Sequence, residues 1–385
     1  MRPFLLPPPA RRRQKPSAFS LLEILLATTI LLMLMVVLFQ TVGMIAATWK
    51  SAGGQVSAFD NARSAFSTIS ETLSRATLNT YVDYVDQSGK PRSAATASTF
   101  VPDHYARNSE LHFVSGPATD FLAETGSTGY TAGDAIFFQA PYGYSDISDQ
   151  STTGDLTRLS RALNNIGFQI KYELPDSRTL PTWVQTFFGS KTYRFQLVEY
   201  VQPTEKIQTY TATQSANYSL DWLTSWLGDT PAPRPRVLAE DVLLLLFRPR
   251  LSPDDESALA SQIGTTYNST LIGTVLSPNY CYDSRAWQTG YTGNVPTNLV
   301  ATMRNQLPPL IDVVMVCADR RSLARLDQTT STPPAALQVP TSLFQQCQNL
   351  EQDLTTYSQQ LTAAHIRFHT FRTCVQVQGG KWVTY

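Results

Sequence analysis

The longest apolar run of the chain lies near its start. From Phe19 to Thr48 the only charged residue is Glu23. About 20 helical residues, at about 1.5 Å each, span a hydrocarbon core of about 30 Å, and Phe19–Leu38 meets that length. The pattern therefore predicts a membrane-spanning helix over residues 19–48. An unpaired acid costs up to roughly 3 kcal/mol at the centre of such a helix, so Glu23 needs a partner.

The next apolar residues are spaced for one face of a helix. Spacings of three and four predict an amphipathic helix over residues 49–80. Gly53-Gly54 marks a place where the helix could bend. We therefore expect a helix from about Phe19 to Asn79, apolar all round in its first half and one-sided in its second. The residues of the apolar face are Val56, Phe59, Ala62, Phe66, Ile69, Leu73 and Ala76.

Residues 81–385 alternate between short apolar runs and turn formers, which is typical of an α+β domain with strands in an antiparallel sheet. We expect a loop over 81–110, a short helix over Asp221–Gly228, a loop-rich insertion at about 251–300 and a helix over 341–364. The continuous apolar run Val242–Phe247 favours a central strand covered on both faces. The predicted strands are Glu110–Ser115, Asp134–Ala140, Asp155–Leu163, Gly167–Leu174, Lys191–Val201, Val237–Arg248, Leu310–Ala318, Ile366–Val377 and Lys381–Tyr385.

The charge distribution predicts an orientation. Arg2, Arg11, Arg12, Arg13 and Lys15 precede the apolar run. Since positive flanks stay on the cytosolic side, we expect a cytosolic N-terminus and export of everything after about residue 50. The chain has 30 basic and 30 acidic residues among 385, so no nucleic-acid partner is predicted.

All four cysteines lie in the predicted exported part. Cys281, Cys317, Cys347 and Cys374 have spacings that match no zinc motif. An even number in an oxidising compartment favours at least one disulfide, with the pairing left open, against buried free thiols as the alternative.

The segment from Lys15 to Glu23 resembles the N-terminus of type IV prepilins and pseudopilins. The resemblance implies a leader over residues 1–18, cleavage between Ala18 and Phe19 by a prepilin peptidase, and N-methylation of Phe19. Glu23 is then the fifth mature residue, which in this family pairs with the N-terminal amine of a neighbouring subunit. Ala18 departs from the glycine usual before the cut. Two other interpretations are a plain signal anchor and a secretory signal cleaved near Ile45-Ala46-Ala47.

A second resemblance concerns the head. Leu238–Arg248 and Leu307–Asp319 look like phrases of larger minor pseudopilins, such as the J component of type II secretion and the W-type minor pilins. The chain looks closest to the pilin-like C component of a verrucomicrobial multi-protein cassette. The resemblance implies a pilin-like fold, inner-membrane localisation before filament assembly, and three kinds of partner: other pilin-like subunits, an inner-membrane assembly platform and membrane lipid.

Candidate chemistry is sparse. His365 and His369 have the spacing of a helical metal pair, but the residues between them favour a strand. The acidic run Asp254-Asp255-Glu256 lacks the ligand alternation of a calcium loop. We expect no metal, no cofactor and no enzymatic activity. The alternative hypothesis is a signal-anchored exported enzyme or binding protein.

Overall fold

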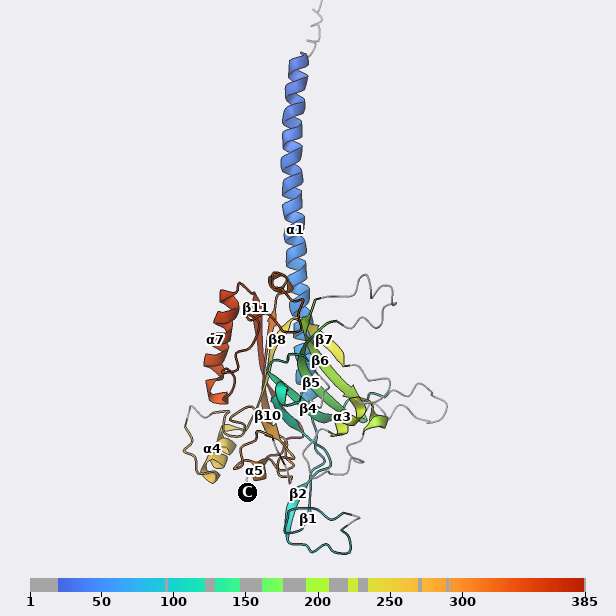
Figure 1. The fold of residues 1–385 in the computed structure, drawn as a ribbon, viewed down its shortest axis with the longest axis vertical. Coiled ribbons are helices and arrows are strands. Elements are labelled where there is room, and N and C mark those ends of the chain that lie inside the picture. The colour runs from blue at the N-terminus through green and yellow to red at the C-terminus, as the bar shows by residue number, and fades with distance from the viewer. Residues whose placement is uncertain are drawn as a thin grey trace, which may run out of the picture. The chain divides into compact units, whose positions relative to one another are not determined.

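The computed structural model describes residues 20–93, 96–121, 129–145, 161–175, 192–207, 221–227, 235–268, 272–288, 291 and 293–383. The chain divides into two compact units, Met1–Val56 and Ser57–Tyr385, and the second is an α+β head with antiparallel sheets (Figure 1).

The predicted N-terminal helix is confirmed as α1, Leu21–Ser74. Ser20 precedes it, and the Glu23 N–H donates to the Ser20 Oγ at 3.3 Å, the contact expected of an N-cap. The helix is continuous through Gly53 and Gly54, and the boundary between the two units falls just after them, at Val56 and Ser57.

A six-stranded antiparallel sheet forms the larger layer of the head. Its strand order is β7-β6-β5-β4-β3-β9. The strands are β3 (Val114–Pro117), β4 (Asp134–Pro141), β5 (Leu163–Glu173), β6 (Arg194–Gln202), β7 (Arg236–Glu240) and β9 (Tyr282–Asp283).

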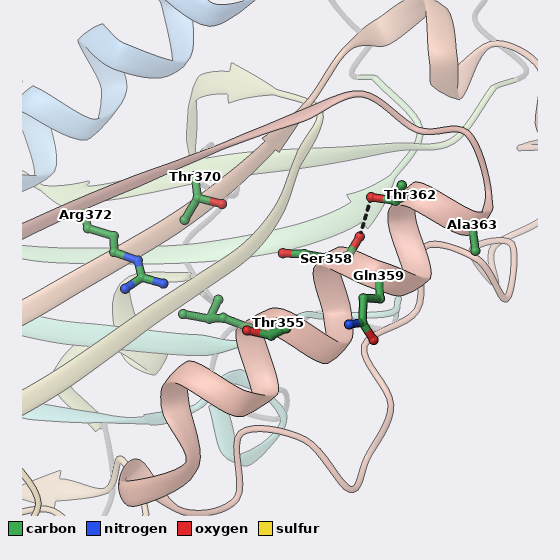
Figure 2. A pocket seen from close by; sticks show the side chains of 8 residues that line it. Thr355, Ser358, Gln359, Thr362, Ala363, Thr370 and Arg372 are labelled. Atoms are coloured by element: carbon green, nitrogen blue, oxygen red, sulfur yellow. Dashed lines mark hydrogen bonds between the residues drawn. The ribbon is translucent and has the colours of Figure 1, made fainter.

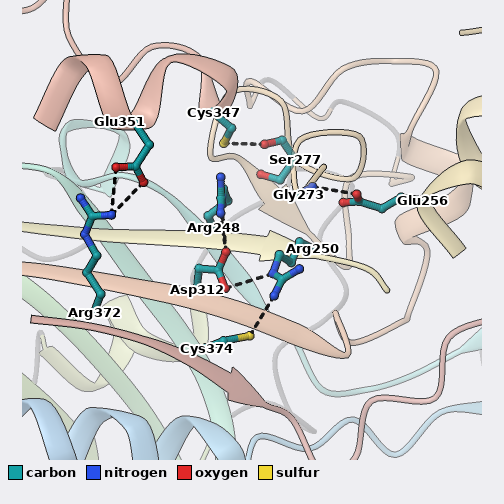
Figure 3. A network of polar contacts seen from close by, with 10 residues as sticks. All are labelled: Arg248, Arg250, Glu256, Gly273, Ser277, Asp312, Cys347, Glu351, Arg372 and Cys374. Carbon is teal, nitrogen blue, oxygen red and sulfur yellow. Dashed lines mark hydrogen bonds and ion pairs between the residues drawn. The ribbon is translucent and has the colours of Figure 1, made fainter. Parts of the chain in front are cut away.

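A second antiparallel sheet has the order β11-β10-β8. Its strands are β8 (Val242–Arg250), β10 (Leu310–Ala318) and β11 (Phe368–Gln376). Asp312 of β10 lies opposite Arg248 and accepts from both Arg248 and Arg250, at 2.5 and 3.0 Å. Figure 3 shows this network, with the Cys374 thiol of β11 next to the Arg250 guanidinium. The ion pairs fix the register of β8 against β10.

We define the head part of α1 as Ser57–Ser74. This part and helix α7 (Leu350–Ala363) cover opposite faces of the three-stranded sheet. Phe371 of β11 stacks near Phe66 of α1, with ring centroids 5.7 Å apart. The next residue, Arg372, pairs with Glu351 of α7 at 2.8 Å. Because successive strand residues point to opposite faces, the two helices sandwich the sheet.

The main hydrophobic core lies between these layers. It joins the apolar side chains of β8 and β10, one face of the six-stranded sheet and the buried face of α1, which consists of Ala62, Ala65, Phe66, Ile69, Leu73 and Ala76. A smaller core lies on the other face of the six-stranded sheet, where Trp222 and Trp226 of α3 (Asp221–Leu227) pack against Phe137 and Tyr200. The short helix that carries them is as predicted.

The prediction of one continuous strand over Val237–Arg248 is wrong, because these residues belong to two strands, β7 and β8. Asp241 adopts a φ of 62°, which turns the chain out of β7 in one sheet and into β8 in the other. Aspartate tolerates this left-handed conformation better than most residues. The apolar run of β8 is buried on both faces as expected, but β8 is an edge strand and β10 is the central one. Gly133 and Asp134 lie against that edge, where the Asp134 carboxylate accepts from the Phe247 N–H at 2.8 Å.

Two predicted loops contain regular structure. Within 81–110, β1 (Tyr81–Val85) pairs with β2 (His104–Asn108), and the Tyr84 and Tyr105 rings stack at 4.0 Å. The insertion at 251–300 contains α4 (Pro253–Gln262) and β9, and α5 (Val300–Met303) begins at its end.

The acidic run of residues 254–256 lies in the first turn of α4. Ser252 caps it by accepting from the Asp255 N–H at 3.2 Å, and Pro253 occupies the first helical turn. Carboxylates in a first turn interact favourably with the helix dipole, which explains the acidic run without a cation.

Other boundaries moved. Four predicted strands match β4, β5, β6 and β10 to within four residues at each end. The predicted strand Glu110–Ser115 is shifted along the chain to β3, and the predicted strand Ile366–Val377 is shortened to β11.

The remaining predicted strands and one helix differ more. In the predicted strand Asp155–Leu163, Leu163 is instead the first residue of β5, and residues 155–160 lie outside the described residues. Residues 381–383 form no strand, and 384–385 lie outside the described residues. The predicted helix 341–364 begins only at Leu350, because Phe344 has a φ of 57° and Gln346 is extended. The other short helices of the described residues are η1 (Ala118–Phe121), η3 (Thr204–Lys206), α6 (Arg320–Leu323) and η4 (Cys347–Asn349).

Candidate functional site

The N-terminal motif is described only in part. Ala18 and Phe19 lie outside the described residues, whereas Ser20 and Glu23 lie at the start of α1. Ser20 and Glu23 have the spacing of a capping box, in which a serine caps the helix three residues before a glutamate. Ser20 therefore caps the start of α1 through the Glu23 N–H, and the Glu23 carboxylate takes no part in this contact.

The apolar stretch of α1, which we define as Leu21–Ile45, meets the criteria for a membrane span by length and composition. It has 25 residues and a mean hydropathy of 2.7, and none of it is buried within the chain. At about 1.5 Å per residue it exceeds a hydrocarbon core of about 30 Å. This finding agrees with the predicted span.

The hydroxyl groups inside the apolar stretch are satisfied within the helix. Thr28, Thr29 and Thr41 each donate to a carbonyl three residues earlier, at 2.8–2.9 Å. The carboxylate of Glu23, in contrast, makes no hydrogen bond or ion pair within the part of the chain that the structure describes. Such hydroxyls tolerate an apolar environment, whereas an unpaired carboxylate does not.

The four cysteines are free thiols in the structure. Cys317 lies opposite His369 on β11, and Cys374 lies opposite Asp312. The two positions are five residues apart along the strand pair, about 16 Å, which is beyond the reach of a disulfide. Cys281 and Cys347 both border Ser277: Cys347 donates to the Ser277 carbonyl, and the Ser277 hydroxyl donates to the Cys281 carbonyl. At least one disulfide stays a prediction, and the strand register excludes a bridge between Cys317 and Cys374.

The two histidines do not share a helix. His369 lies on strand β11, as predicted, whereas His365 lies in the turn after α7 with a φ of 56°. Among the described residues, no group of three or more His, Cys, Asp or Glu side chains could hold a metal ion.

The groove between α7 and β11 has a volume of about 540 Å³ (Figure 2). Two of its hydroxyl groups are used locally: Thr355 and Thr362 donate to carbonyls of their own helix at 2.8 Å. The one cation among its lining residues, Arg372, is paired with Glu351. The lining residues include no acid and no histidine, so they form no acid–base pair.

A buried polar cluster was missed by the sequence analysis. His112 Nε2 lies 2.9 Å from the Asp283 carboxylate, and the Trp222 indole N–H donates to His112 Nδ1 at 3.3 Å. Burial lowers the pKa of His112 and outweighs the charge of Asp283, so the imidazole is neutral and its Nε2–H donates. With both ring nitrogens in use, His112 serves as a structural link between β9 and α3. The three residues are more than 50 positions apart, so no local motif could have revealed them.

Burial perturbs two carboxyl groups at the junction of the sheets. Burial raises the pKa of Asp134 to about 8, although the Phe247 N–H opposes the shift. Burial also raises the pKa of Asp241 to about 7, and the neighbouring charge of Glu240 adds to the effect. Both groups connect the two sheets structurally.

No protein-family model, curated protein or solved structure matches this chain.

Proposed function

We propose that the chain is a minor pilin-like structural subunit, held in the inner membrane by α1 with its head exported, and then assembled into a filament or pseudopilus. A prepilin peptidase would cut between Ala18 and Phe19, Phe19 would be N-methylated, and an inner-membrane platform would drive assembly with other pilin-like subunits. No catalysis is involved.

The observation that carries the proposal is the position of Glu23. It is the one acid in an otherwise uncharged stretch that is exposed all round, and its carboxylate has no partner among the described residues. In an apolar bundle an uncompensated carboxylate is strongly destabilising. The amine created by a cut before Phe19 supplies the missing positive charge, from a neighbouring chain.

The arrangement of α1 supports the same proposal. Its apolar stretch leaves its surface available to lipid or to equivalent helices, while the part after Ser57 packs into the core of the head. One helix would thereby provide both filament contact and attachment of the head.

Assembly of a Glu23→Val variant tests the register role. We expect loss of incorporation into sheared filaments or membrane-extracted oligomers, with wild-type amounts of chain retained in the membrane. Glu71→Val is the matched control, since Glu71 is an exposed acid on the head part of the same helix. Equal incorporation of wild type and Glu23→Val would exclude the pairing role.

A further inference from the structure

Gln40 carries the one side-chain amide in the apolar stretch of α1. Met33 is the middle residue of that stretch, and Gln40 follows it by seven residues, which is about 10 Å along the helix axis. The hydrocarbon core of a bilayer extends about 15 Å from its midplane, so a centred stretch places the amide within the apolar phase. An amide without a hydrogen-bond partner is unfavourable there.

The helix itself does not satisfy this amide. The next residue, Thr41, donates its hydroxyl to the Leu38 carbonyl at 2.9 Å. The Gln40 side chain is exposed and, in contrast, makes no hydrogen bond within the part of the chain that the structure describes. An amide offers two donors and an acceptor oxygen with two lone pairs. A suitable partner therefore has to accept and donate, and it has to reach the amide from outside the helix.

The face of α1 around Gln40 has the spacing of a helix-packing seam. At about 100° per residue, four residues lie within about 60° of it around the axis. They are separated by alternating steps of four and three, the spacing by which two helices pack along their length. Glycine on such a face lets a second helix approach closely, and a Cβ added at Gly43 would meet nothing within 4 Å. The four residues are Thr29, Met33, Val36 and Gly43.

This face is not the one that carries Glu23. Gln40 follows Glu23 by 17 residues, which places the two side chains about 100° apart around the helix and about 26 Å apart along it. The face around Gln40 contains no charged residue. A contact through Gln40 therefore involves a different neighbour, or a different side of the helix, from the contact proposed for Glu23.

We propose that the face of α1 centred on Gln40 binds the same face of a second copy of this chain in the membrane, with the two helices parallel and the two Gln40 amides hydrogen bonded to each other. Side-chain amides form such bonds between membrane helices. An amide is self-complementary, and two copies inserted in the same direction bring their Gln40 residues to the same depth. Lipid tails offer neither a donor nor an acceptor. The proposal rests on the membrane span and goes beyond the filament role, because it requires neither cleavage of the leader nor assembly.

Sedimentation equilibrium of the full chain in density-matched detergent micelles tests the contact. The uncut chain from cells without a prepilin peptidase is used, so that the result does not depend on the cut before Phe19. We expect a monomer–dimer equilibrium, with a dissociation constant that Gln40→Leu raises by roughly threefold to thirtyfold. Gln40→Asn keeps an amide and should lose less. Thr41→Leu is the matched control, since its hydroxyl is bonded within its own helix, and should leave the constant unchanged.

Cross-linking in native membranes locates the face. Met33→Cys lies within about 20° of Gln40 around the helix, whereas Leu31→Cys lies on the opposite side at nearly the same depth. Both side chains are exposed in the structure, and both variants carry Cys374→Ser, which removes the exposed native thiol. Oxidation by copper–phenanthroline, which takes up the two electrons of the new disulfide, should give dimers of Met33→Cys and few of Leu31→Cys.

The variants lie outside the core of the head, so the urea unfolding of the head should be the same for all of them. Equal dissociation constants for wild type and Gln40→Leu would overturn the proposal, as would equal cross-linking at positions 31 and 33. A wild-type chain that stays monomeric in both experiments would mean that lipid or a different protein covers this face, and would also overturn it. An intact leader in cells with an active peptidase would contradict the filament role and leave this contact unaffected.

Discussion

The two parts of α1 use apolar side chains in opposite ways. In the apolar stretch, Leu32 is 65% exposed, whereas in the head part Ile69 and Leu73 are fully buried. The head part needs only one apolar face, because the head supplies the matching surface. The apolar stretch has apolar side chains all round and no matching surface among the described residues, so it needs lipid or other helices. The head part therefore stabilises its own chain, whereas the apolar stretch requires lipid or another chain.

The largest difference between the two parts should come from truncating one leucine in each. Leu73→Ala should lower the free energy of unfolding of the head by about 2–5 kcal/mol, because it leaves a cavity in the core. Leu32→Ala should leave that free energy unchanged. Urea unfolding in detergent, followed by fluorescence of the buried tryptophans, measures both. Equal losses from the two variants would contradict the division of roles.

An added charge should affect the apolar stretch more than the head part of α1. Leu32→Arg places a cation in the apolar stretch and should cost about 2.5–3.5 kcal/mol of insertion free energy. We expect part of the variant to move from the membrane pellet to the alkaline supernatant on extraction. Ser67→Arg, on the exposed face of the head part, is the control and should remain in the pellet. Retention of Leu32→Arg at the wild-type level would argue against a membrane span.

An acid of the apolar stretch and an acid of the head also differ in their hydrogen bonding. Glu23 has no partner in the described chain, whereas Asp134 is buried and accepts from the Phe247 N–H. The pKa of Asp134 is raised from 3.8 to about 8 in the folded state, so that state binds the proton more tightly. Its contribution to stability is complete below pH 3.8 and is lost as the pH rises through about 8.

Asp134→Asn keeps an acceptor for Phe247 but cannot ionise. Between pH 5 and pH 9, wild type should therefore lose about 1–3 kcal/mol more unfolding free energy than the variant, since relaxation and water entry reduce the full effect. Unfolding curves at both pH values provide the measurement, and the exposed Asp254→Asn should follow wild type. Parallel pH profiles for wild type and Asp134→Asn would show that Asp134 does not titrate in this range.

Some features of the fold could be predicted because their signals are local. The helical spacing of Ile69 and Leu73 and the apolar run of β10 each indicate an element directly. The turn at Asp241 could not be predicted, because the change of sheet depends on what β7 and β8 meet in space. The capping role of Ser252 has a local signal, a serine followed by proline and acids, because this order is typical of the start of a helix.

The candidate site residues also divide into those with a local sequence signal and those without one. Glu23 is conspicuous because it breaks an apolar run. Asp283 and His112 are separated by 171 positions and meet only through the pairing of β3 with β9. No spacing rule reaches across such a distance, so the buried polar cluster could be found only from the structure.

The most direct test of the proposed filament role is the mass of the mature chain from membranes of cells with an active prepilin peptidase. The proposal predicts loss of residues 1–18 from the 385-residue chain and one methyl group on the new terminus, Phe19. An intact chain that begins at Met1 would contradict the proposal and favour a signal-anchored exported enzyme or binding protein. A chain cut near Ala47 would favour a secreted one.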